Sequence, residues 1–189
     1  MFDKLFGGSK KAAAEPNISF GRYSDNNKSM EKTSRWTDAD NLYKEKKYYQ
    51  SIEAFFDYLR DDAADNVVLQ GSSNSFNFQI YQGSKIVRGS GDISHLHAEV
   101  SLAKMPQPSV PVMRRLLDQN FSLYYSRYSL DGERLCMRFD SDIETANPNK
   151  LYYALKELAT KADKQDDQLV QDFSLLQSLD ADHAEQIPA

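Results

Sequence analysis

Hydrophobic residues recur at steps of three and four along residues 37–62, TDADNLYKEKKYYQSIEAFFDYLRDD. This spacing is the period of an amphipathic helix, so we expect one helix that ends near Asp61. Thr37 or Asp38 can cap its first free amides. The buried stripe of this helix would consist of Leu42, Tyr48, Tyr49, Ile52, Phe55, Phe56 and Leu59.

The pattern then changes to the alternation that is typical of strands. Apolar and polar side chains alternate along residues 75–81, SFNFQIY, and residues 66–70 form a short β-branched stretch before them. The turn sequence QGSK makes residues 85–90 the hairpin partner of 75–81. Residues 95–102, HLHAEVSL, alternate again. Their inward face would carry Leu96, Ala98, Val100 and Leu102.

A second helix and a second hairpin follow. Three prolines between residues 106 and 111 end the first group of strands and open a helix at residues 109–120. The expected apolar stripe of that helix is Val110, Met113, Leu116 and Leu117. Strands at residues 121–130 and 133–140 flank Asp131-Gly132, which is a strong tight-turn signal.

A long helix is the last expected element. Asn147 is placed to cap it, and Pro148 suits its first position. The charged stretch DKQDDQ around Asp166 leaves a break in the middle of this helix open. Its apolar stripe would consist of Leu151, Leu155, Leu158, Ala162, Leu169, Phe173 and Leu176.

The expected order of elements is therefore α-β-β-β-α-β-β-α, with a fourth strand before the second helix as an alternative. Hairpins with helices on one face make a two-layer α+β fold, in which an antiparallel sheet of about five strands packs against helices. We divide the chain into a flexible basic leader (residues 1–37), a single domain (38–177) and a disordered acidic tail (178–189).

Composition narrows the classes of function. The formal net charge of -5 argues against a general nucleic-acid binder, which needs a surplus of Lys and Arg. Cys136 is the single cysteine, so nothing requires an oxidising compartment. The chain has no run of 18 apolar residues that could span a bilayer and no glycine-rich phosphate loop. We expect a cytoplasmic protein without a cofactor.

His95, His97 and Glu99 fall at alternate positions of one expected strand, which would place all three on one face. Two imidazoles at this spacing, roughly 6.6 Å apart along the strand, could share a metal ion. Glu99 lies roughly 13 Å from His95 on a straight strand, too far to complete the site. The inward face of this strand also needs a polar opposite face, which these residues supply. We favour the solvent-facing interpretation and keep the metal site as the alternative.

The aromatic stretch FSLYYSRYSL suggests a partner-binding surface on the second hairpin. If residues 121–130 form a strand, Tyr124 and Tyr128 share one face. Arg127, Arg134 and Arg138 lie nearby, and Tyr and Arg are enriched in protein interfaces. The alternative is that sheet and helix bury this hairpin on both sides. No Cys-His spacing supports catalysis at Cys136, which is more typical of a small packing residue.

The stretches RLCMRFDSDIE and NPNKLYYALKELATKADKQDDQL, together with the opening helix and NVVLQ, carry a resemblance. Over roughly residues 38–175 the chain resembles the type III secretion chaperone-like fold, and in particular the YbjN family of bacterial regulators. The resemblance implies a bacterial, non-enzymatic protein. Chaperones of this fold bind extended partner segments and dimerise, so a protein partner and a homodimer are expected. It transfers no catalytic residues.

We therefore predict a non-enzymatic protein-binding module, chaperone-like or regulatory, for an unidentified protein or peptide. Tyr124, Tyr128, Arg127, Arg134 and Arg138 are its predicted contact residues. Two alternatives belong to other classes: a small metal-dependent enzyme that uses His95 and His97, and a structural protein whose self-association is its function.

Overall fold

The computed structural model describes residues 29–61, 66–82 and 85–179. Most of the predicted leader and tail, residues 1–28 and 180–189, lie outside the described residues. The elements in chain order are α1 (Met30–Lys44), α2 (Tyr48–Leu59), β1 (Val67–Ser72), β2 (Ser75–Gln82), β3 (Lys85–Asp92), β4 (His95–Lys104), α3 (Val110–Asn120), β5 (Arg127–Asp131), β6 (Arg134–Asp142), the 3-10 turn η1 (Ile143–Thr145), α4 (Pro148–Asp172) and β7 (Gln177–Ser178).

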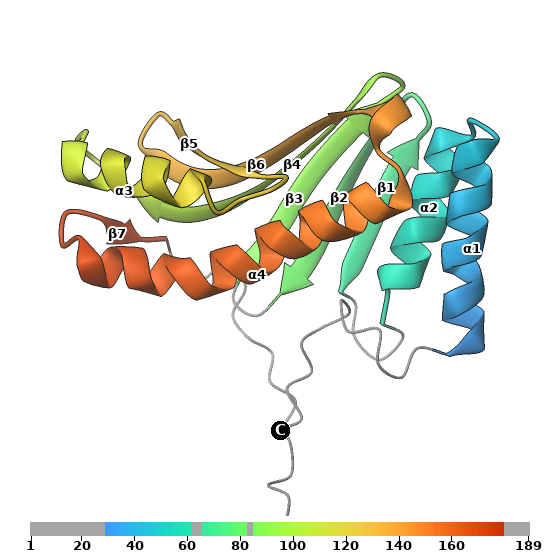
Figure 1. Ribbon diagram of the computed structural model, residues 1–189, viewed down its shortest axis with the longest axis horizontal. Helices are drawn as coiled ribbons and strands as arrows, with labels where there is room; N and C mark the ends of the chain where they lie inside the picture. Colours follow the sequence, from blue (N-terminus) through green and yellow to red (C-terminus); the bar gives the residue numbers. More distant parts are fainter. Residues whose placement is uncertain (1–28, 62–65, 83–84, 180–189) are drawn as a thin grey trace, which may run out of the picture.

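The described strands form one antiparallel sheet in the order β1-β2-β3-β4-β6-β5, with β7 paired to β4. The helices lie on one face of this sheet (Figure 1). α4 crosses that face, α1 and α2 lie side by side near β1, and α3 packs on β5. The two-layer α+β class is as predicted. The predicted sheet of about five strands is too small: four strands precede α3, as in the alternative order, and β7 adds a seventh strand.

The expected single helix of residues 37–61 is a pair of helices. α1 begins at Met30, where Ser29 Oγ accepts from the Lys32 amide at 3.2 Å, so residues 30–37 are helical. The chain turns at Lys46, whose φ of 61° ends the first helix. Ser51 Oγ then donates to the Ala39 carbonyl at 2.7 Å and ties the two helices together.

Small residues in β3 allow aromatic rings to lie flat on the inner face of the sheet. Gly89 stands opposite Phe78, and Gly91 stands opposite Phe76. A Cβ atom at either glycine would overlap the facing phenyl ring. Both rings are buried, and Phe78 also contacts Phe56 of α2 with 4.8 Å between ring centroids. These contacts position α2 over the sheet.

α4 is a continuous helix, and it begins where the sequence predicts. Asn147 Oδ1 accepts from the Lys150 amide at 2.9 Å, and Pro148 is the first helical residue. The helix has no break at Asp166, whose carboxylate pairs with Lys85 Nζ of β3 at 2.7 Å. Both side chains of this pair are nearly buried. The predicted leucines of the stripe are buried, and Phe173 is partly buried after the helix.

Candidate functional site

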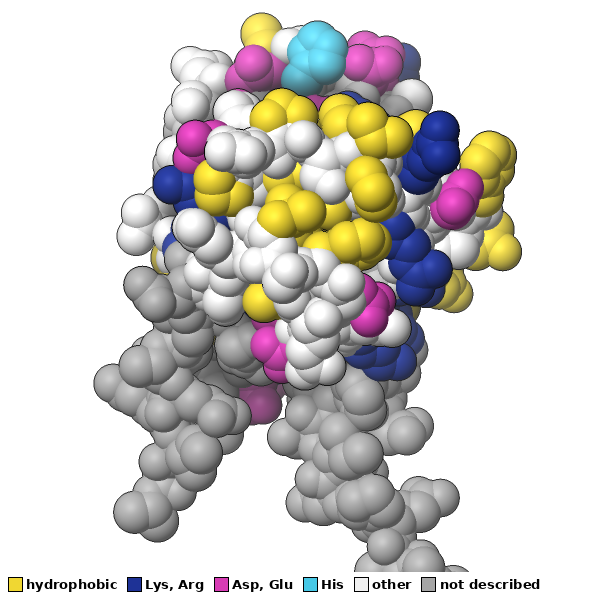
Figure 2. Space-filling model, turned by 90° about the vertical axis from the view of Figure 1, so that its left-hand side faces the viewer, with side chains coloured by type: hydrophobic (Ala, Val, Ile, Leu, Met, Phe, Trp, Pro, Cys, Tyr) yellow, Lys and Arg dark blue, Asp and Glu magenta, His cyan; other side chains and the backbone are white. Residues whose placement is uncertain are grey.

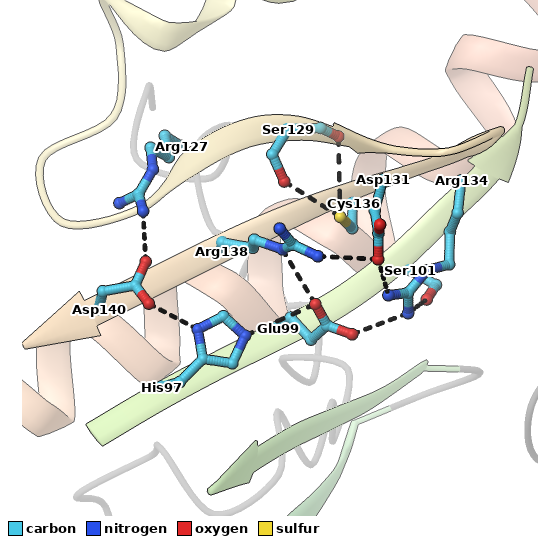
Figure 3. Close-up of polar contacts among 10 residues, drawn as sticks. All are labelled: His97, Glu99, Ser101, Arg127, Ser129, Asp131, Arg134, Cys136, Arg138 and Asp140. Carbon is cyan, nitrogen blue, oxygen red and sulfur yellow. Dashed lines mark hydrogen bonds and ion pairs between the residues drawn. The ribbon is translucent and has the colours of Figure 1, made fainter. Parts of the chain in front are cut away.

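The face of the sheet opposite the helices carries a cluster of charged side chains on β4, β6 and β5 (Figure 3). We call it the charged cluster, and its members are His97, Glu99, Arg127, Asp131, Arg134, Arg138 and Asp140. The strand register explains why they meet. Glu99 stands opposite Arg138, and Arg138 stands opposite Arg127, while the next row pairs His97 with Asp140.

Glu99 lies at the centre of the charged cluster. Its carboxylate accepts from Arg134 Nη1 at 2.7 Å and from Arg138 Nε at 3.0 Å. Partial burial raises the pKa of Glu99, but the two guanidinium groups outweigh this effect, so its pKa lies below the ordinary value. Asp131 accepts from Arg134 at 2.8 Å and from Arg138 at 3.0 Å, and its bond from Arg134 lowers the pKa of Asp131. Each of these two arginines is therefore shared between two acids.

The predicted metal residues do not form one site. His97 Nδ1 lies 2.6 Å from Asp140 Oδ1, and its Nε2 lies 3.5 Å from Glu99 Oε2. His95 turns to Asp142 instead, with 3.2 Å between Nε2 and Oδ1, and is largely exposed. Within residues 29–61, 66–82 and 85–179, no three His, Cys, Asp or Glu side chains gather as a metal site. The strand spacing brings His97 and Glu99 together, and the two arginines occupy that carboxylate.

The predicted Tyr/Arg surface is split between two faces, so that prediction was wrong as a single surface. Arg127, Arg134 and Arg138 belong to the charged cluster. Tyr128 faces the helices, is 7% exposed, and stands opposite Met137. Tyr124 precedes the strand, because β5 begins only at Arg127 and residues 121–126 are irregular. The strand alternation assumed for residues 121–130 therefore does not apply to Tyr124.

Burial also distinguishes Tyr128 and Cys136 from surface residues. Burial raises the pKa of the Tyr128 phenol, whose oxygen has no hydrogen-bond partner among the described residues. Cys136 is buried in β6, and its Sγ lies 3.1 Å from Ser129 Oγ. Both side chains are therefore part of the packing.

The loop that follows α3 is held in place by α4. The amides of Tyr124 and Tyr125 donate to the Glu157 carboxylate at 3.1 Å, and Ser126 Oγ donates to it at 3.0 Å. Three donors on one carboxylate fix the backbone of the loop. The Tyr124 side chain nevertheless points to solvent and is 91% exposed. The loop thus presents an aromatic ring from an anchored backbone.

α3 is apolar on two faces, which sequence reasoning missed. Its inward face consists of Val112 and Leu116, both buried. Of the four residues predicted to face inward, Val110, Met113 and Leu117 are exposed instead. They are 60%, 40% and 62% exposed, and Phe121 continues their line at 93%. We call Val110, Met113, Leu117 and Phe121 the α3 stripe.

Basic side chains accompany these exposed apolar residues. Figure 2 looks onto the end of the molecule that carries α3 and β7, and hydrophobic side chains gather in the middle of that face with Lys and Arg beside them. Arg114 lies four residues after Val110 and three before Leu117, so it borders the α3 stripe. Arg114 and Arg115 are exposed, and neither forms an ion pair within the described part of the chain.

A separate cavity of about 310 Å³ lies where the α1–α2 turn meets the β3–β4 turn. Its walls include Phe76, Ile93 and Ile143, with Lys46 and Asp92 among the polar residues. No histidine or cysteine is among its lining residues, so it holds no pair of nucleophile and imidazole base. No described helix is long and apolar enough to cross a membrane.

Comparisons with known proteins give similarity at the level of structure. No family model matches the chain, and neither does any curated protein sequence. A chain of the heterodimeric ExoU–SpcU complex from the type III secretion system of Pseudomonas aeruginosa is similar in structure, with a TM-score of 0.37 and 13% sequence identity. The similarity covers 60% of this chain and 89% of that chain. Membership of the YbjN family stays a prediction.

Proposed function

We propose that this protein is a non-enzymatic protein-binding module that holds a segment of another protein on the α3 stripe. The observation that carries the proposal is a helix with apolar residues on both faces and only one face covered. Val112 and Leu116 are buried where α3 packs on β5, whereas Leu117 and Phe121 are mostly exposed. Exposed apolar surface with a polar border is typical of protein interaction sites.

Tyr124 supports the same assignment. Its ring is exposed beside the end of α3 while its backbone is fixed by Glu157. An aromatic side chain on a rigid backbone loses little conformational entropy when a partner covers it. The charged cluster is a weaker candidate, because its arginines already pair with acids and a partner would have to replace those pairs. The predicted contacts Arg127, Arg134 and Arg138 are therefore not part of the proposal.

Site-specific photo-crosslinking in cells of the source tests the proposed function. A photoreactive amino acid at Leu117 should crosslink to a second protein, whereas the same amino acid at Ile93 should not. Ile93 is the matched control because it is 72% exposed, apolar and in the β3–β4 turn. Crosslinks only to another copy of the chain would favour the predicted homodimer and a structural function. Equal yields of the same crosslinked products from Leu117 and from Ile93 would contradict the proposal.

The proposed place of action is the cytoplasm. Cys136 is buried and unpaired, so the fold does not depend on a disulfide or on an oxidising compartment. No metal or other cofactor is part of the proposed function.

A further inference from the structure

We propose that the occupant of the α3 stripe is an amphipathic helix of another protein, with Asp and Glu residues beside its apolar stripe. This inference rests on the proposed function and names the chemistry of the partner. Two features of α3 carry it, namely the spacing of its exposed apolar residues and Arg114, which has no ion pair in the described structure and lies at their border.

The spacing favours a helix as the partner. Val110, Met113, Leu117 and Phe121 follow one another at steps of three, four and four, so they form a ridge about 16 Å long. Ridges of this kind pack into the grooves of another helix. An extended segment would find few partners here, because amides and carbonyls within α3 bond to each other. A helical partner satisfies its own backbone and needs only side-chain contacts, as in helix-in-groove recognition.

The charge favours an acidic partner. α3 carries Arg114 and Arg115 against Asp118 alone, in a chain whose formal net charge is -5. Arg114 lies between Val110 and Leu117 on the helix surface, where a residue beside the partner's apolar stripe would meet it. Carboxylates at that position would neutralise guanidinium groups that have no ion pair in the described structure. They would also exclude partners with basic residues there.

A second copy of the chain fits this surface less well. Pairing α3 with α3 would bring four arginines and two aspartates together, since each copy contributes Arg114, Arg115 and Asp118. The interface would then keep an excess of positive charge, which opposes association. An acidic partner removes that excess.

The test uses the full chain and three fluorescent peptides of about 20 residues, long enough to form a helix on binding. The first carries leucines at helical spacing flanked by Glu. The second has the same leucines flanked by Lys. The third has the Glu residues but scrambled leucines. Fluorescence anisotropy should show that the acidic amphipathic peptide binds at least tenfold more tightly than either control. Raising the salt from about 50 mM to about 500 mM should reduce the difference in affinity between the acidic amphipathic peptide and the Lys peptide.

Three variants locate the binding. Leu117→Asp should weaken binding of the acidic peptide at least tenfold, while Ile93→Ser, the matched control, should leave it unchanged. Arg114→Glu combined with Arg115→Glu should reverse the preference towards the Lys peptide. All four side chains are exposed, so each variant should fold, and circular dichroism checks this.

Other outcomes overturn the inference in distinguishable ways. If both amphipathic peptides bind equally and Leu117→Asp weakens both, the stripe binds proteins but has no preference for acids, so the proposed function stands and the inference fails. If none of the peptides binds and Leu117 gives no crosslinks in cells, both fail. If light scattering shows a dimer that Leu117→Asp dissociates, a second copy occupies the stripe and the inference is wrong.

Discussion

Glu99 on β4 and Arg138 on β6 stand directly opposite each other, and Arg138 Nε donates to Glu99 Oε2 at 3.0 Å. Arg134 binds the other oxygen of the same carboxylate at 2.7 Å. Asp131 also pairs with both arginines, but its side chain is 51% exposed, whereas that of Glu99 is 19% exposed. This arrangement makes Glu99 the residue on which the charged cluster depends.

Replacing Glu99 with Gln should lower the free energy of unfolding by about 1–2 kcal/mol. The amide keeps the size of the side chain but leaves Arg134 and Arg138 with Asp131 as their one shared acid. Partial exposure of the pairs limits the loss of stability. Urea denaturation measures the change, which should shrink at about 1 M salt. Glu133→Gln is the control. Its pair with Lys104 is about half exposed, so we expect a change within about 0.5 kcal/mol. Equal effects of the two variants would contradict the prediction.

The same cluster predicts how stability depends on pH. The pKa values of Glu99, Asp131 and Asp140 are lower in the folded chain than their ordinary values of about 4. Between the folded and unfolded pKa the unfolded chain binds more protons, so stability rises with pH there. Their contribution should be complete above about pH 5 and lost as the pH falls through the folded values. Urea midpoints between pH 7 and pH 3 test this, and Glu99→Gln should flatten the profile.

Asp92 tests at a single residue how hydrogen bonds lower the pKa of a carboxyl group. Ser94 Oγ donates to Asp92 Oδ1 at 2.7 Å, and the amides of Ser94 and His95 donate to the same oxygen. These bonds lower the pKa of Asp92 to about 2. Ser94→Ala removes the hydroxyl bond and should raise the pKa of Asp92, as read from NMR titration of its carboxyl carbon. An unchanged titration midpoint of Asp92 would contradict this prediction and show that the backbone amides alone lower its pKa.

Gly89→Ala should destabilise the fold by about 2–3 kcal/mol. The added methyl group would overlap the ring of Phe78, which is fully enclosed and cannot move aside. Gly132→Ala is the comparison, because its Cβ would meet nothing but its φ of 59° is unfavourable for alanine. That variant should cost about 1 kcal/mol. Thermal unfolding ranks the two variants, and the opposite ranking would contradict the packing described for β3.

The orientation of α3 can be tested with two adjacent leucines. Leu116 is 7% exposed and Leu117 is 62% exposed. Leu116→Ala should therefore cost about 2–4 kcal/mol through loss of burial and the cavity that remains. Leu117→Ala should change stability by less than about 0.5 kcal/mol. Chemical denaturation measures both changes, and similar losses of stability would mean that α3 does not bury Leu116 in preference to Leu117.

Sequence reasoning succeeded where a regular period extends over many residues. The leucine spacing of residues 148–172 and the cap Asn147 are local signals, and the structure follows both. The alternation of residues 95–102 likewise placed Leu96 and Val100 inward, as their burial confirms. In these segments the local preference and the tertiary packing agree, so the pattern alone was sufficient.

The sequence pattern failed to predict features that depend on contacts between residues far apart in the chain, or that have no local sequence signal. Lys46 takes a left-handed conformation without being Gly or Asn, so nothing in the sequence marks the end of α1. β7 has two residues and is defined by its pairing with β4. The contact between His97 and Asp140 joins residues 43 positions apart.

α3 shows a different cause of failure. Both of its faces are apolar, and periodicity cannot say which face the sheet covers. The burial of Leu116 and the exposure of its neighbour Leu117 show which face the sheet covers.

The position of α4 in the chain has a consequence for synthesis. α4 contacts β2, β3, β4 and β6, and it follows all of them in the sequence. On the ribosome, the strands therefore emerge before the helix that covers them. Until α4 has been synthesised, the inner side of β3, β4 and β6 lacks the helix that covers it in the folded protein. Apolar surface that is exposed in this way during synthesis favours aggregation of the incomplete chain.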